Sequence, residues 1–257
     1  MTGITEYAIA FVIAVIGGMI NGIAGGGTVL VFPMLVWLGL NPVEANITNA
    51  ISLWTASLGG AVGFAGALRL TRRIWFWLAV PAAAGGLIGA LLLVRLPPDV
   101  FSSSAPFFVL GATLLLLAQP VIHRRLTLLT GHPQDSAGRR AAAVISILAI
   151  SIYGGYFGAG LGIFLLVALG LLGIGDLASA NGLKNVFGFL TKGIAVLSFA
   201  VTGSVIWDVA FVLMIGSVLG AYAAARLGAR ISERTLRTSI IGVGFVMSAL
   251  MLAGIAG

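Results

Sequence analysis

The chain of 257 residues contains no cysteine and very little charge, since only 8% of its residues are Asp, Glu, Lys or Arg. The absence of cysteine excludes disulfide bonds and thiolate metal sites and leaves the redox compartment undefined. A soluble domain carries about 25% charged residues, so this shortage argues against a soluble fold. Instead, 60% of the residues are hydrophobic, 37 are glycine, and the mean hydropathy is +1.14. Several runs reach the roughly 20 apolar residues that a spanning helix needs, which indicates an all-α integral membrane protein.

The net charge of +7 does not indicate a nucleic-acid partner. The arginines cluster in short stretches between apolar segments, as the positive-inside bias produces. The N-terminal residues, Met1 to Glu6, lack the basic region of a signal peptide, so we expect the first apolar run to be retained. We therefore expect a multi-pass protein of the cell inner (plasma) membrane that contacts membrane lipid and no nucleic acid.

The apolar segments fall into two sets of five. The only long polar stretch, residues 123–140, separates them. We expect a first membrane repeat over residues 1–122, a cytoplasmic connector over 123–140 and a second membrane repeat over 141–257. The ten segments cover about 6–23, 28–40, 43–68, 74–94 and 104–122 in the first repeat, and about 141–157, 162–174, 177–203, 205–225 and 236–256 in the second.

The two halves match at fixed offsets, which indicates internal duplication. At an offset of 135, the motif GGGTVL that begins at Gly25 falls on GLGIFL at Gly160. The pair Ala45-Asn46 falls on Ala180-Asn181 at the same offset. At an offset of 131, Gly85, Gly89 and Gly111 fall on Gly216, Gly220 and Gly242.

The placement of arginine predicts that the two repeats are inverted. If basic loops are cytoplasmic, eleven of the twelve arginines lie inside and only Arg95, near Asp99, lies outside. Both termini then lie outside. An inverted repeat needs an odd number of crossings per half, which is satisfied by five crossings, or by three crossings plus a re-entrant hairpin of the first two segments. The second segments of about 13 residues reach roughly 20 Å, against a hydrocarbon core of about 30 Å.

Each short second segment follows a glycine-rich turn, and this pattern points to a transporter binding site. Gly25-Gly26-Gly27 would end one helix and let backbone N–H groups converge, with the next helix beginning at about Thr28. The second turn is Gly158-Ala-Gly-Leu-Gly162. Such turns can hold an oxyanion. The alternative is that the glycines only let helices pack closely, which fits Gly85, Gly89 and their counterparts well.

Lys184 and Lys192 are the only lysines, and both lie in the apolar segment 177–203. An ammonium at membrane depth costs a few kcal/mol and usually faces the interior of the bundle. Lys184 lies near enough to the segment end to reach the membrane surface instead, whereas Lys192 lies near the centre. Asn181, Asn185 and Gly188 are spaced so that they lie on the same helical face as the two lysines, which we call the lysine stripe. For the asparagines the alternative role is hydrogen bonding between helices.

We predict that these polar groups and turns bind a small anion in one central pocket. The candidate substrate-binding residues are Asn21, Gly25, Gly26, Gly27, Thr28, Asn46, Thr48, Asn49, Gly158, Gly160, Gly162, Asn181, Lys184, Asn185 and Lys192. We predict no catalytic residue, no metal site and no cofactor. An enzyme would need paired acid–base or ligand residues within an apolar segment, and the two histidines, His123 and His132, lie in the connector.

At these residues the chain resembles the sulfite exporter TauE/SafE family, also called the 4-toluene sulfonate uptake permeases. The motif GGGTVLVFP at Gly25 is followed by ANITN at Ala45, and the pattern recurs as GAGLG at Gly158 and ANGLK at Ala180. The resemblance covers nearly the whole chain. Leu161 stands where the second turn of the family is typically richer in glycine. The resemblance implies transport of small organosulfur anions: sulfite, sulfoacetate or related sulfonates.

We therefore expect a permease that moves such an anion outward. Two alternatives stay open, an anion channel with the same pocket as its filter and a carrier of a small carboxylate or other organic anion. A homodimer is also an open expectation. The residue pattern does not determine the individual substrate, the coupling of transport or the element that moves.

Overall fold

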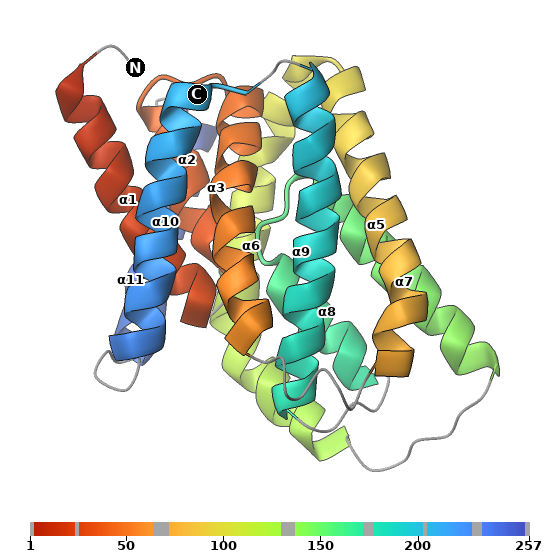
Figure 1. Cartoon of the computed structure of the whole chain (residues 1–257). Coiled ribbons are helices and arrows are strands. Elements are labelled where there is room, and N and C mark those ends of the chain that lie inside the picture. Colours follow the sequence, from red (N-terminus) through yellow and green to blue (C-terminus); the bar gives the residue numbers. More distant parts are fainter. Residues whose placement is uncertain are drawn as a thin grey trace.

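The computed structural model describes residues 3–23, 26–63, 72–129, 137–171, 177–202, 205–227 and 233–254 (Figure 1). Within these ranges the chain forms helices and no strands, and every helix overlaps an apolar segment expected from the sequence. The all-α prediction is therefore confirmed. The helices are α1 (Ile4–Ile23), α2 (Gly27–Trp37), α3 (Pro42–Gly63), α5 (Arg72–Arg95), α6 (Pro98–Leu129), α7 (Ala137–Tyr156), α8 (Leu161–Leu171), α9 (Leu177–Thr202), α10 (Trp207–Leu227) and α11 (Glu233–Leu252).

Five of the described helices, α1, α5, α6, α9 and α10, contain stretches that are long and apolar enough to cross a membrane. Shorter apolar stretches lie in α2, α7, α8 and α11. Large hydrophobic side chains such as Phe107, Val201 and Ile215 are more than half exposed, which suits lipid as the surrounding solvent. The protein is accordingly a polytopic membrane protein.

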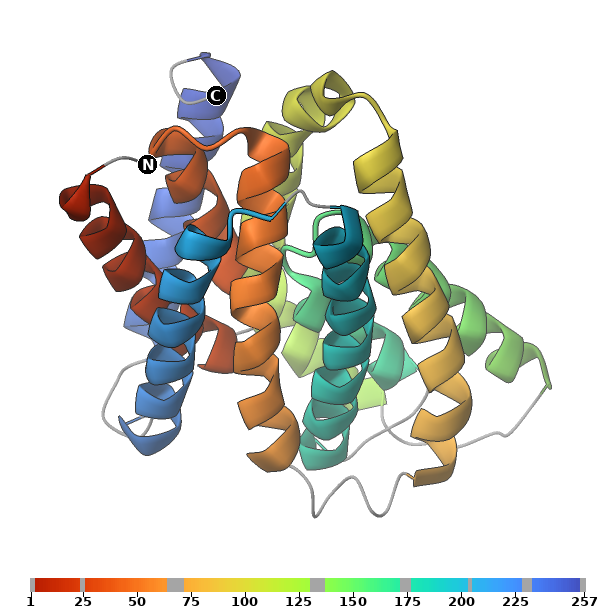
Figure 2. The ribbon, with the colours of Figure 1, turned by 45° about the horizontal axis from the view of Figure 1, so that its top comes forward.

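The first two helices of each half form a hairpin that enters the bundle and returns (Figures 1 and 2). α1 begins at the end of the bundle where the chain termini lie, and α2 returns to that end before α3 begins. α7 and α8 form the equivalent hairpin from the opposite end. The described residues of the two turns, Gly26 and residues 157–160, are buried. This arrangement favours the re-entrant alternative that the sequence left open, because α3, α5 and α6 of the first half and α9, α10 and α11 of the second run between the ends of the bundle (Figures 1 and 2).

The contacts between helices follow a pseudo-two-fold pattern that interlocks the two repeats. α1 packs against α10 of the other repeat, and α7 packs against α5 in the equivalent way. α3 contacts α10, as α9 contacts α5. The equivalent helices α3 and α9 pack against each other, and so do α6 and α11. The repeats are therefore not separate bundles side by side.

Glycines and hydroxyl groups hold these inter-repeat contacts. A Cβ at Gly85 would lie 2.6 Å from the carbonyl oxygen of Leu148 in α7, and one at Gly216 would lie 2.8 Å from that of Phe11 in α1. The close-packing interpretation of these glycines is confirmed. Ser52 Oγ donates to the carbonyl oxygen of Leu213 at 3.0 Å, which ties α3 to α10. A hydroxyl of α9 binds the equivalent carbonyl of α5, at 3.3 Å between Thr191 Oγ1 and the Ala82 oxygen.

α6 is longer than the sequence predicts, since it runs from Pro98 to Leu129 rather than over 104–122. Pro98 suits a first helical turn because it needs no hydrogen bond there, and Asp99 complements the positive end of the helix dipole. Pro120 lies inside the helix without ending it. Residues up to Leu129 and from Ala137 onward are helical, so the helices of the two repeats extend into the polar stretch 123–140.

Candidate substrate-binding site

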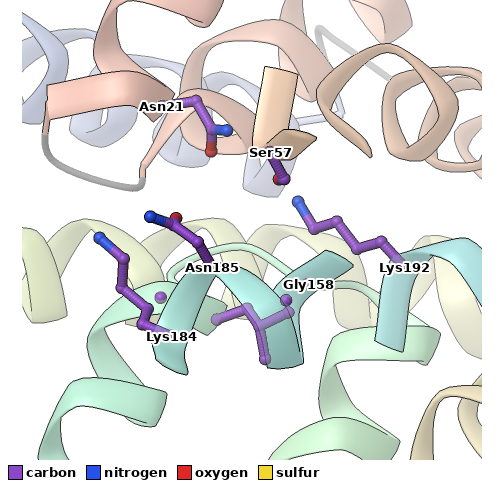
Figure 3. Close-up of a pocket in the computed structure, with 9 residues that line it drawn as sticks. Asn21, Ser57, Gly158, Lys184, Asn185 and Lys192 are labelled. Atoms are coloured by element: carbon purple, nitrogen blue, oxygen red, sulfur yellow. The ribbon is translucent and has the colours of Figure 1, made fainter. Parts of the chain in front are cut away.

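A pocket inside the bundle is lined by residues of both repeats (Figure 3). α1 and α3 of the first repeat each contribute one side chain, and the rest come from the second hairpin and α9. The cavity that remains has a volume of about 30 Å³, which is enough for about two water molecules. A larger solute would displace the flexible lysine side chains. The lining residues are Asn21, Ser57, Gly158, Leu161, Gly162, Lys184, Asn185, Gly188 and Lys192.

Both lysines reach this pocket from α9. Figure 3 shows Lys184 and Lys192 at its two ends, with Asn185 and Gly158 between them. Lys192 is only 7% exposed, so it does not extend to the membrane surface. Lys184 is partly buried. In the part of the chain that the structure describes, neither ammonium nitrogen has a hydrogen-bonding or ion-pair partner. The pocket therefore holds two cationic groups that are available to a ligand.

The second glycine-rich turn forms one wall of the pocket. Gly158 and Gly160 have φ angles of +79° and +71°, in the left-handed region that favours glycine. The turn ends α7 at Tyr156 and starts α8 at Leu161. Gly162 is the second residue of α8, so its N–H is among the amides that have no acceptor within the helix. The positive end of α8 thus begins at the pocket, as the sequence predicts for this turn.

The described glycines of the first turn, Gly26 and Gly27, do not line this pocket. A Cβ at Gly27 would lie 3.1 Å from the Asn21 Cβ, so Gly27 brings α2 against α1 beside the pocket rather than into it. A Cβ at Gly26 would lie 2.8 Å from Leu116 of α6. Gly25 is outside the described residues, and the side chain of Asn181 is not described. The described candidates that do not line this pocket are Gly26, Gly27, Thr28, Asn46, Thr48, Asn49 and Gly160.

The asparagines of α3 belong to a buried contact between the repeats. Asn46 Nδ2 donates to the carbonyl oxygen of Tyr156 at 2.8 Å, which ties α3 to the end of α7. This is the interhelical role that the sequence left open for asparagine. The side-chain oxygens of Asn46, Thr48 and Asn49 are buried and have no hydrogen-bonding partner among the described residues.

The comparisons with known proteins agree with this architecture. The sequence model of the family described as sulfite exporter TauE/SafE matches residues 10–251. The chain belongs to the sulfite exporter TauE/SafE family. The resemblance noted in the sequence is thereby confirmed.

Relatives of this TauE/SafE protein match over almost their whole length. A probable membrane transporter protein of Haemophilus influenzae is 28% identical over 258 residues, which cover 97% of this chain and 96% of that protein. The probable membrane transporter protein YfcA of Escherichia coli K12 is 27% identical, over 95% of this chain and 88% of its own. A third, from Sinorhizobium sp., is 27% identical over 96% and 92%. These names support a membrane transporter and specify no substrate. No solved structure matches the chain at a significant level.

Sequence reasoning missed Ser57 and Leu161 and did not select Gly188. A signal for Ser57 was available, because it lies 135 positions before Lys192 and is therefore its counterpart in the first repeat. Gly188 was placed on the lysine stripe. A Cβ there would meet nothing within 4 Å, so this glycine leaves the pocket open. Leu161 lies between the selected Gly160 and Gly162, but the sequence marked it only as a departure from the glycine-rich pattern of the turn.

In this TauE/SafE protein the pocket belongs mainly to the second repeat because the equivalent positions of α3 are neutral and filled. Asn49 and Ser57 replace Lys184 and Lys192 at the offset of 135, and Ala50 replaces Asn185. Leu53, which is fully buried, stands where α9 has Gly188. The site is therefore one-sided even though the fold around it is pseudo-symmetric.

Buried aromatic rings pack against the second turn, a feature that the sequence analysis did not predict. Phe157, at the turn, packs edge-on against Phe32 of α2 with ring centroids 5.1 Å apart and stacks on Phe108 of α6 at 5.3 Å. Tyr153 donates its hydroxyl to the carbonyl oxygen of Ala159 at 2.7 Å. These contacts hold Gly158 and the start of α8 in place at the pocket.

Proposed function

We propose that this protein is an inner-membrane permease for small organosulfur anions such as sulfite, sulfoacetate and related sulfonates, and that it moves them outward. The observation that carries the proposal is the pocket at the start of α8, whose two ammonium groups have no partner among the described residues. Asn21 and Asn185 add amide donors beside them. Sulfite and sulfonate groups present three oxygens that accept such hydrogen bonds, and charge-assisted bonds are the stronger kind.

The direction rests on charge and membrane potential. The arginine-bearing ends of α6, α7, α10 and α11 and the N-terminal end of α5 lie together at the end of the bundle opposite the termini, whereas Arg95 ends α5 on the other side. By the positive-inside rule that end is cytoplasmic, which supports our proposal that both termini lie outside. An inside-negative potential favours expulsion of an anion by about 2.3 kcal/mol per charge per 100 mV. Export by this route needs no coupling ion.

Ligand binding can be tested by thermal shift. The panel contains sulfite, sulfoacetate, sulfolactate, thiosulfate and simple carboxylates, measured on the wild type and on Lys184→Ala. We expect at least one sulfur-containing anion to stabilise the wild type and Lys184→Ala to lose most of that shift. Arg95→Ala is the matched control. It removes an exposed cation at the C-terminal end of α5, which does not line the pocket, so it should leave the thermal shift unchanged. Stabilisation by carboxylates alone would select the carboxylate carrier instead, and no stabilisation by any anion would refute the site.

Flux measurements separate a carrier from a channel. Re-entrant helices in inverted repeats are typical of carriers, so we expect saturable flux in proteoliposomes that accelerates when anion is present on both sides. Conductance in single-channel recordings would instead select the anion channel. Flux that ignored membrane potential and followed a proton gradient would contradict uncoupled export.

A further inference from the structure

Packed aromatic rings lie between the second glycine turn and the end of the bundle where the chain termini lie. Phe101 is the fourth residue of α6, which begins at that end, so it lies only about 5 Å along the helix from its start. Its ring centroid is 5.9 Å from that of Phe157, which follows α7 at the turn. Phe32 of α2 packs edge-on against both rings, at 6.0 and 5.1 Å. All three side chains are at most 3% exposed. With Phe108, which stacks on Phe157, they form what we call the ring cluster.

The pocket extends from the turn toward the opposite end of the bundle, which carries most of the arginines. α9 begins at that end, and Lys184 is its eighth residue, about 10 Å along the helix axis. Lys184 and its neighbour Asn185 are partly exposed. Lys192, about 12 Å further along α9, is only 7% exposed, and Gly158 of the turn is buried. Exposure within the pocket therefore falls from the arginine-bearing end toward the turn and the ring cluster.

The ring cluster is not repeated at the equivalent place in the other half of the chain. At the offset of 135, Phe157 corresponds to Gly22 and Phe32 corresponds to Val167. An inverted repeat places equivalent positions toward opposite ends of the bundle. Bulky rings therefore fill the region toward the termini, whereas small or aliphatic residues stand at the equivalent positions toward the arginine-bearing end.

The ends of the first helices of the two hairpins differ in the same way. Tyr156, the last residue of α7, corresponds to Asn21 near the end of α1. The Tyr156 ring packs against Phe101 at 5.5 Å, and its carbonyl oxygen accepts a hydrogen bond from Asn46. Asn21 instead lines the pocket. One end of the pseudo-symmetric bundle is thus closed by contacts between the repeats at the position where the other end borders a cavity.

We propose that the ring cluster is the barrier between the pocket and the end of the bundle where the termini lie, and that the pocket opens to the arginine-bearing end in this conformation. The inference rests on the proposed function, since it concerns access to the same pocket. A hydrated anion does not pass between packed apolar rings, because it would lose its water there without gaining polar partners. Passage to the terminal end requires Phe157 to separate from Phe32 and Phe101, which belong to the other hairpin and to α6.

Labelling of a cysteine in the pocket tests the barrier. Ser57→Cys places a thiol in the pocket of a chain that otherwise has no cysteine. A membrane-impermeant, negatively charged methanethiosulfonate is added to each face of the membrane in turn, without substrate, and the initial labelling rates are compared. The exposed positions Gly138→Cys and Gly254→Cys identify the arginine-bearing and terminal faces, whichever of them is cytoplasmic. We expect Ser57→Cys to be labelled rapidly from the Gly138 side and slowly or not at all from the Gly254 side.

Removing a ring should abolish this sidedness. In Ser57→Cys protein, Phe157→Ala opens the ring cluster, so the labelling rate from the Gly254 side should rise to match that from the Gly138 side. Phe211→Ala is the matched control, because it removes a ring of α10 that is 57% exposed and lies outside the ring cluster. It should keep labelling one-sided. Phe108→Ala removes a partly buried ring of the cluster and provides the same test if Phe157→Ala does not fold.

The labelling outcomes are independent of anion binding. Equal initial rates from the two sides with the ring cluster intact would overturn the barrier, and so would one-sided labelling in the folded ring variant. Absence of labelling from the Gly138 side would overturn the opening toward the arginine-bearing end. Failure of the proposed function would appear separately, as the absence of stabilisation by any anion in the thermal-shift panel.

Discussion

Trp54 of α3 stacks on Phe189 of α9, with ring centroids 5.3 Å apart and ring planes 18° from parallel. The two residues are 135 positions apart, so each is the counterpart of the other in the duplicated sequence. Thr113 and Gly244 repeat this relationship at the offset of 131, since a Cβ on Gly244 would lie 3.0 Å from Thr113 Cγ2. Equivalent residues can touch only close to a two-fold axis. The pseudo-symmetry axis therefore passes through the α3–α9 and α6–α11 contacts.

The α3–α9 contact at the axis leaves no room for a larger residue at Gly193. A Cβ there would lie 2.9 Å from Trp54 Nε1. We expect Gly193→Ala to destabilise the protein by about 1–3 kcal/mol, the usual range for overpacking. Gly188→Ala, on the same helix, is the control, because its Cβ meets nothing and alanine favours a helix over glycine by about 0.5–1 kcal/mol. Thermal unfolding in one detergent should give Gly193→Ala a lower melting temperature than Gly188→Ala. Equal melting temperatures would contradict the packing argument.

Filling the pocket should abolish ligand binding without unfolding the protein. Gly188→Leu introduces the residue that the first repeat already has at the equivalent position, Leu53. Because a Cβ at Gly188 meets open space, the leucine enters the cavity of about 30 Å³ rather than a packed interface. We expect a melting temperature close to that of the wild type and no stabilisation by any anion of the panel. An undiminished ligand shift in this variant would place the anion elsewhere.

The amides of α3 and α9 should behave differently on substitution. Asn46 joins two helices, whereas Asn185 lines the pocket. Removing a hydrogen bond between membrane helices costs about 0.6 kcal/mol on average and up to about 1.7. We expect Asn46→Ala to lower the melting temperature and leave the anion affinity unchanged. We expect Asn185→Ala to lower the anion affinity and leave the melting temperature unchanged. Thermal unfolding with and without ligand measures both quantities. A loss of anion affinity in Asn46→Ala would show that Asn46 takes part in anion binding after all.

The helices were predictable because each membrane helix needs an apolar run, and such a run can be recognised from the local sequence without knowing which other helix it contacts. Even α2 and α8, at 11 residues each, stood out through the glycine turns before them. The interlocking of the repeats was not predictable. The sequence places Gly85 and Gly216 in equivalent positions, but only the structure pairs α5 with α7 and α1 with α10. Which helices meet depends on the packing of whole surfaces, and no local pattern records it.

The sequence predicted the two charges of the site, the second glycine turn and the amides of Asn21 and Asn185, but not which side of the pseudo-symmetric bundle holds the pocket. Lys184 and Lys192 were identifiable because an ammonium in an apolar segment needs a reason to be there. The α3 candidates looked equally suitable, since Asn46 and Asn49 follow a glycine turn just as Asn181 and Lys184 do. The difference lies in volume: the buried Leu53 fills on α3 the space that Gly188 leaves open on α9. Residue type marks a polar group, whereas access to it depends on its neighbours.

The close approach of α5 to α7 should tolerate no side chain at Gly89. A Cβ there would lie 2.7 Å from the Tyr156 nitrogen and 2.9 Å from the Gly155 carbonyl carbon, and backbone atoms cannot move aside cheaply. Gly89→Val should therefore destabilise the protein by about 3 kcal/mol or more. Gly242→Val is the control, because Gly242 is exposed and its Cβ meets nothing. The yield of monodisperse protein in size-exclusion chromatography measures the effect, and equal yields would contradict this helix contact.

Because the chain has no cysteine, single introduced cysteines can report its orientation without background. Gly254 is exposed at the end of the bundle where the termini lie, and Gly138 is exposed at the start of α7, near the opposite end. If the arginine-rich end is cytoplasmic, a membrane-impermeant maleimide should label Gly254→Cys in intact cells and Gly138→Cys only after permeabilisation. The opposite result would reverse the orientation and with it the electrical driving force for export. Labelling of both from one side would contradict the inverted arrangement of the repeats.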